Sequence, residues 1–203
     1  MSKKRIVVIC PGRGSYTRET SNYLKEYGAP VSKSIQWMDD QREAQGLLSL
    51  TNLDRQNFKA RTHMVGENAS SLIYACSFSD FMSIDRNKYE IVSVLGNSMG
   101  WYTALVLSGA VSWKNGFHLV NTMGSMMKDE LIGAQMIYPI VNDKWNVDQN
   151  MKDLVMSELS NAEAYLSINL GGFIVIGGDK STLKKLSKIL PVKDKYPLII
   201  PYH

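Results

Sequence analysis

The stretch Ile91-Val-Ser-Val-Leu-Gly96-Asn97-Ser98-Met99-Gly100 decides the fold. Its first five residues are mostly β-branched and apolar, which is typical of a buried strand. The residues after Gly100 favour a helix over 101–108. A Gly-x-Ser-x-Gly pattern between a strand and a helix indicates a nucleophile elbow, where glycines permit a sharp turn that exposes the serine Oγ. The stretch therefore predicts an α/β fold with Ser98 as candidate nucleophile; the alternative is a glycine-rich connection carrying a solvated serine.

The rest of the first 130 residues repeats this alternation of strands and helices. Residues 6–10 form a β-branched run that ends at Pro11-Gly12, which predicts another buried strand. Helices are expected near 23–27, 40–48, 68–82 and 113–130, the last with Ser112 as N-cap. Buried strands that alternate with helices indicate a parallel sheet.

The pattern changes after residue 130. Strands are expected over 134–141, 164–169 and 173–177, and helices over 148–160 and 181–190. This order predicts a small α+β unit inserted into the larger one. We therefore expect a larger α/β core over 1–130, a small subdomain over 131–194, and a strand within 195–203 that returns to the core.

Composition excludes several classes of protein. The 203 residues are 44% hydrophobic and 21% charged, with a net charge of +4, which is typical of a globular protein and too weakly basic to indicate nucleic-acid binding. No apolar run approaches the roughly 18 residues of a membrane span. The apolar run at 6–10 is too short for a signal peptide, so we expect a cytoplasmic protein in which Cys10 and Cys76 are buried free thiols.

A serine nucleophile needs a base, and the sequence offers three histidines. His118 lies within a predicted helix and His63 in a polar stretch, so both are expected to have surface or packing roles. His203 follows a predicted strand, at the side of a parallel sheet where sites gather, and is our candidate base.

A second glycine pattern, Gly12-Arg13-Gly14, follows the first predicted strand. Because Thr17 occupies the third glycine position of a dinucleotide fingerprint, the turn fits better as a source of backbone N–H groups for an anion. We expect no metal, since no His/Cys cluster has ligand spacing.

These motifs together resemble those of malonyl-CoA:acyl carrier protein transacylases and the related acyltransferase domains of polyketide synthases. The family's F-P-G-Q-G-S stands here as Cys10-Pro-Gly-Arg-Gly-Ser15, and its G-H-S-L-G-E-Y-x-A-L as Gly96-Asn-Ser-Met-Gly-Trp-Tyr-Thr-Ala-Leu105. Further matches are Ser108-Gly-Ala-Val-Ser112, Asn169 with the following Gly172–Gly177, and Pro201-Tyr-His203.

The resemblance implies an α/β-hydrolase-like parallel-sheet core with an inserted ferredoxin-like subdomain. It also implies that Ser98 takes an acyl group from acyl-CoA, that His203 is the base, and that the N–H groups of Arg13 and Met99 hold the oxyanion. Asn169 would line the substrate pocket. The thiol of a carrier protein's phosphopantetheine would then accept the acyl group, in fatty acid or polyketide synthesis, by a monomeric enzyme without a bound cofactor.

Three features depart from the family pattern. Met123 stands where the family has an arginine that binds the malonate carboxylate, which favours uncharged acyl groups unless a basic residue elsewhere compensates. Asn97 and Trp101 replace the His and Glu that flank the family's serine, so the pocket lining differs. The family continues for about another third of a chain beyond its histidine, so we interpret this sequence as truncated and expect poor activity from these residues alone.

Two alternative functions fit the same sequence. An acyl-thioester hydrolase would share Ser98 and His203 but release the acyl group to water. A degenerate, non-catalytic relative would bind a carrier protein without acylation at Ser98. The altered neighbours of Ser98 and the early end of the sequence are the reasons to consider the latter.

Overall fold

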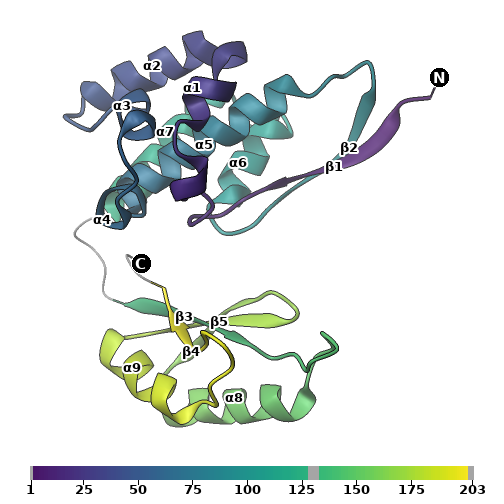
Figure 1. Ribbon diagram of the computed structural model, residues 1–203, viewed down its shortest axis with the longest axis vertical. Coiled ribbons are helices and arrows are strands. Elements are labelled where there is room, and N and C mark those ends of the chain that lie inside the picture. The colour runs from purple at the N-terminus through teal and green to yellow at the C-terminus, as the bar shows by residue number, and fades with distance from the viewer. Residues whose placement is uncertain (1, 128–132, 201–203) are drawn as a thin grey trace. The chain divides into compact units, whose positions relative to one another are not determined.

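The computed structural model describes residues 2–127 and 133–200. The chain divides into two compact units, Met1–Asp129 and Glu130–His203 (Figure 1). Each unit has a hydrophobic core of its own. In the described part of the chain, no helix is long and apolar enough to cross a membrane.

The first unit combines a small parallel sheet with a helical layer. Strands β1 (Lys4–Cys10) and β2 (Tyr89–Gly96) pair in parallel, from Lys4 opposite Tyr89 to Cys10 opposite Gly96. The sequence predicted both strands, and the structure confirms them. The helical segments are η1 (Arg18–Thr20), α1 (Tyr23–Tyr27), η2 (Ala29–Val31), α2 (Ser32–Glu43), α3 (Leu50–Arg55), α4 (Ala60–His63), α5 (Gly66–Ser83), α6 (Gly100–Leu107) and α7 (Trp113–Met126).

Helix α5 lies at the centre of this unit and contacts α1, α3, α6 and α7 (Figure 1). Its residues Leu72, Tyr74 and Ala75 have no exposed surface. The predicted N-cap of α7 is confirmed, because the Ser112 side chain accepts a hydrogen bond from the Asn115 N–H. Cys10 and Cys76 are free thiols, as predicted, with Cys10 buried and Cys76 partly buried.

One guanidinium joins three of these helices. Arg42 of α2 is fully buried and donates to the carbonyl oxygens of Leu48 and Glu67 and to the Oδ1 atoms of Asn68 and Asn121, at 2.6–2.9 Å. Burial lowers the pKa of the Arg42 guanidinium below its ordinary value. All four hydrogen-bond acceptors are uncharged, and the nearby carboxylates of Glu67 and Asp39 partly offset the effect of burial on the charged form. The network fixes α2 against α5 and α7.

The prediction that both strands are buried is wrong for one face of the sheet. Val7 and Ile9 of β1 are 49% and 70% exposed, and Val92 and Leu95 of β2 are 41% and 46% exposed. Val8 and Cys10 alternate with Val7 and Ile9 and belong to the core that the helices form. Parallel sheets are ordinarily covered on both faces. Among residues 2–127, which the structure describes, one face of this sheet lacks such a cover.

The second unit is a four-stranded antiparallel sheet with two helices. Its elements are β3 (Ala134–Pro139), α8 (Gln149–Asn161), β4 (Tyr165–Asn169), β5 (Phe173–Gly178), α9 (Lys180–Ile189) and β6 (Leu198–Ile199). The strand order is β4-β5-β3-β6, and Figure 1 shows both helices on one face. The order of elements and strands is that of a ferredoxin-like fold, as predicted.

The last strand corrects one sequence-based expectation. We expected residues 196–200 to return to the larger core, as part of a segment 195–203. Instead Leu198 and Ile199 of β6 pair with Ile137 and Met136 of β3, at the edge of the second unit's sheet. The strand therefore completes the small unit.

Candidate active site

The turn between β2 and α6 has the strand–turn–helix geometry that the Gly-x-Ser-x-Gly pattern predicts. Ser98 is exposed and has a φ of +54°, in the left-handed region. A residue with a Cβ is strained in that region. The Gly100 N–H donates to the Asn97 carbonyl and the Trp101 N–H to the Ser98 carbonyl, which closes the turn at the start of the helix. Ser98 is therefore held in a strained backbone conformation and exposed in the turn that follows β2.

Glycines allow three pieces of backbone to meet at this turn. A Cβ at Gly100 would overlap the carbonyl oxygen of Cys10, and a Cβ at Gly96 would overlap that of Gly100. A Cβ at Gly12 would lie 2.9 Å from Asn97 O and 3.0 Å from Ser98 Cβ. The loop after β1 is therefore packed against the nucleophile turn with no room for side chains between them.

Two predicted oxyanion donors lie in this region of the first unit. Met99 follows Ser98, and its side chain is buried with Sδ 3.8 Å from the Thr103 hydroxyl. Arg13 follows Gly12, which contacts Ser98 as described above. A helix N-terminus next to a nucleophile presents N–H groups and positive partial charge. Arg13 and Met99 thus lie in the two segments that pack together at Ser98, and their role as oxyanion donors stays a prediction.

The Arg13 side chain brings a basic group near the helix that carries Met123. A Cβ added at Gly66 would lie 2.9 Å from Arg13 Nη1 and 3.2 Å from Gly124 O. Burial lowers the pKa of the Arg13 guanidinium below its ordinary value. The motif pattern did not predict this position of the side chain; the glycines at 66 and 124, which let α5 and α7 approach, were the signal for it.

The predicted pocket residues of the first unit are accessible. Asn97 is exposed, Trp101 in the first turn of α6 is 59% exposed, and Met123 of α7 is 38% exposed. Met126, one helical turn from Met123, is also 59% exposed. These apolar side chains are thus exposed on α6 and α7, two helices that contact each other.

Two histidines have the packing and surface roles expected of them. His63 is 1% exposed, and its ring nitrogens lie 2.9 Å from Leu53 O and 3.1 Å from Lys59 O. His118 is exposed on α7 against Trp37.

Two predicted site residues belong to the second unit. Asn169 is exposed at the end of β4, where its Oδ1 accepts the Gly171 N–H at 3.0 Å. His203 lies outside the described residues, and its role as base stays a prediction.

Several solved structures of acyltransferases have a fold similar to that of this chain. An acyl-carrier-protein S-malonyltransferase from Burkholderia pseudomallei 1710b has a TM-score of 0.72 at 21% identity, covering 98% of this chain and 62% of that one. The malonyl-CoA:acyl carrier protein transacylase from Coxiella burnetii has a TM-score of 0.74 at 18% identity, covering 98% and 61%. A malonyl-transacylase solved with its type II polyketide synthase carrier protein, AntF, has a TM-score of 0.67 at 18% identity, covering 92% and 58%. No protein-family model matches the sequence, and no curated protein does.

The chain thus has the α/β acyltransferase fold with a ferredoxin-like subdomain. More particularly, the fold is that of malonyl-CoA:acyl carrier protein transacylases, which confirms the structural part of the resemblance seen in the motifs. The chain spans about 60% of the length of these solved structures.

Proposed function

We propose that this chain carries the nucleophile of an acyltransferase that moves an acyl group from acyl-CoA to the phosphopantetheine thiol of an acyl carrier protein. The observation that carries the proposal is Ser98, held in the left-handed region between β2 and α6 with Gly12 packed against it. The transacylase fold supports the same chemistry. The reaction would belong to fatty acid or polyketide synthesis. It would take place in the cytoplasm.

The reaction proceeds in two balanced half-reactions. Ser98 Oγ forms an ester bond to the acyl carbon as the carbon–sulfur bond to CoA breaks, and the serine proton passes through His203 to the departing thiol. The phosphopantetheine thiol then attacks the ester, its proton passes through His203 to the serine oxygen, and Ser98 is regenerated. The N–H groups of Met99 and Arg13 would stabilise the oxyanion in both steps.

The acyl group is proposed to be uncharged. With Met123 in place of the family's arginine, a malonate carboxylate would lose its bidentate partner on α7. Loss of such a partner costs about 2–5 kcal/mol in a desolvated site. The exposed Met123, Met126 and Trp101 would instead contact an apolar acyl chain.

Intact-protein mass spectrometry after mixing with acetyl-, medium-chain and malonyl-CoA tests the proposal. We expect acyl adducts with wild type and none with Ser98→Ala. Ser93→Ala, which changes an exposed serine of the preceding strand β2, should load as wild type does. Malonyl loading should be at least about 30-fold slower than acetyl loading. This factor is the change in rate that corresponds to a loss of about 2 kcal/mol, the lower limit given for losing the arginine.

Three outcomes would change the conclusion. Faster loading from malonyl-CoA would overturn the uncharged preference and favour Arg13, whose guanidinium lies beside Gly66, as the group that binds the carboxylate. Adducts that water clears even with a holo carrier protein present would indicate a thioester hydrolase. No adduct from any acyl-CoA would overturn acyl transfer by this chain and favour a non-catalytic carrier-protein-binding role.

A further inference from the structure

Charge in the second unit is strongly segregated along the chain. Residues 180–195 contain six lysines and one acidic residue, whereas residues 133–179 contain two lysines and six acidic residues. Soluble surfaces ordinarily intersperse the two signs. The basic half of this unit begins at α9.

The lysines of α9 are placed on its outer face. Leu183, Leu186 and Leu190 face the core, while Lys180, Lys184 and Lys188 recur at i, i+4 and i+8 and are exposed with Lys185. Like charges four residues apart destabilise a helix by a few tenths of a kcal/mol per pair. Lys180 also lies in the first turn, where the helix dipole disfavours a cation.

Nothing in the described part of the chain offsets this repulsion with an ion pair. The salt bridge found there joins Lys88 and Asp85 in the first unit. The Asp179 carboxylate accepts hydrogen bonds from Ser181 and Thr182 as the N-cap of α9. The outer face of α9 is therefore a stripe of positive charge open to a partner.

Apolar side chains lie beside the charges. Ile189, next to Lys188, is 57% exposed, and Val192 is 79% exposed. Protein interfaces typically surround an apolar centre with a charged rim. A free nucleotide or coenzyme favours a concave site, whereas this is the convex face of a helix. The combination fits an acidic protein surface that also presents apolar side chains.

We propose that this α9 surface, formed by Lys180, Lys184, Lys185, Lys188, Ile189 and Val192, docks the acidic face of the carrier protein. The inference rests on the proposed function, because the carrier protein is the macromolecular substrate of that reaction. Opposite charges speed the encounter and orient the partner, so binding should weaken as salt is raised.

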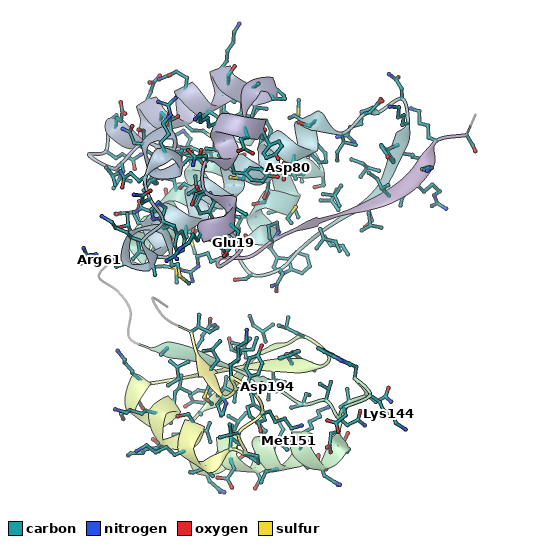
Figure 2. The ribbon with its side chains drawn as sticks, in the orientation of Figure 1. Glu19, Arg61, Asp80, Lys144, Met151 and Asp194 are labelled. Atoms are coloured by element: carbon teal, nitrogen blue, oxygen red, sulfur yellow. The ribbon has the colours of Figure 1, made fainter. Side chains whose placement is uncertain are left out.

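The test compares charge reversal on α9 with charge reversal elsewhere in the same unit. The test variant is Lys184→Glu/Lys188→Glu, and the control is Lys144→Glu/Lys152→Glu. Figures 1 and 2 place α9 and Lys144 at opposite ends of the second unit. The probe is a type II holo acyl carrier protein of net negative charge, and its Kd is measured by fluorescence anisotropy at low and high salt.

We expect the α9 variant to raise the Kd at low salt by at least about tenfold and to lose most of the salt dependence, while the control matches wild type. Lys184→Gln/Lys188→Gln should give an intermediate Kd, and the circular dichroism spectra should agree. Unchanged binding by the α9 variant, or an equal loss in the control, would overturn the inference.

Acylation of Ser98 by acyl-CoA separates this inference from the proposed function. Loading needs no carrier protein, so the α9 variant should load as wild type does. If the α9 variant is acylated at Ser98 and still binds the carrier protein with the wild-type Kd, the docking surface is refuted and the proposed acyl transfer is not. If wild type binds the carrier protein through α9 in a salt-sensitive way but no acyl-CoA acylates Ser98, the acyl transfer is refuted and the docking surface is not.

Discussion

Replacing Ser98 by glycine should make the first unit more stable than replacing it by alanine. Both variants remove the hydroxyl, and Ser98 Oγ makes no hydrogen bond to a described residue, so neither loses a contact through it. They differ in the backbone, because residue 98 has a φ of +54°. A residue with a Cβ is destabilised in the left-handed region by roughly 1–2 kcal/mol, whereas glycine is not.

The magnitude follows from two opposing terms. Glycine loses roughly 0.5–1 kcal/mol more backbone entropy than alanine on folding, which leaves a net gain of about 0.5–1 kcal/mol. For a unit of this size, that gain corresponds to a rise in Tm of about 2–5 °C. Differential scanning calorimetry of Ser98→Gly and Ser98→Ala measures it directly.

Ser93 provides the matched control. It lies in β2 opposite Val7, next to a register shift of the ladder but without a positive φ, and glycine destabilises a strand relative to alanine. The order should therefore reverse: Ser93→Gly melts below Ser93→Ala. If Ser98→Gly melts at or below Ser98→Ala, the strain argument is wrong and the turn does not store conformational energy at its serine.

Three further outcomes are expected. Arg42→Met should destabilise the first unit by about 2–4 kcal/mol in urea unfolding, because buried carbonyl and amide oxygens lose their donor; Arg42→Lys should lose less, and equal losses would contradict the network described for this residue. Hydrogen bonds from Thr182 and Ser181 lower the pKa of Asp179, so it stabilises the second unit above its unfolded pKa near 3.9, and stability is lost as pH falls below about 4. In Asp179→Asn, the unfolding midpoint of the second unit should therefore fall less steeply with pH below about 4. An unchanged pH dependence would exclude this carboxylate as its source. Burial raises the pKa of the Cys76 thiol, so the native protein should react with a disulfide reagent at pH 8 at least about tenfold more slowly than in urea; equal rates would show an accessible thiolate.

The sequence predicted most strands because their β-branched runs are local signals. The helix near residue 40 was placed wrongly: it was expected over 40–48, and α2 spans Ser32–Glu43. Its buried positions, Ile35, Met38, Asp39 and Arg42, have helical spacing, but two of the four are charged. Hydrophobic periodicity cannot reveal a buried arginine whose partners, Asn68 and Asn121, are distant in sequence.

We predicted that both strands are buried because their residues are apolar and β-branched. This prediction fails for one face of the sheet. Strands of a parallel sheet are apolar on both sides, as at Val7, Ile9 and Leu95, because such a sheet is ordinarily covered on both faces. A strand's own sequence does not identify the segment that covers it. Likewise a run such as Leu198-Ile199 signals a strand but not its partner, so β6 was assigned to the wrong sheet.

For the candidate site, the motif predicted the turn at Ser98 but not the surrounding side chains. The positions of Gly12, Gly96 and Gly100 follow from backbone rules that any such turn obeys. The position of the Arg13 guanidinium beside Gly66 depends on the packing of α5 against α7; the glycines at 66 and 124 signal this close packing, but the motif at residues 10–15 does not.

The interlocked backbone at Gly12, Gly96 and Gly100 also limits how such a protein can diversify. No single substitution at these positions is tolerated without moving another segment, so neither natural drift nor a random library can explore them one at a time. Variation is left to side chains outside this fixed frame, and under the proposed function the ones that bear on the acyl group are at positions 97, 101 and 123. A library for new acyl specificity should therefore be concentrated there, with the glycines held constant.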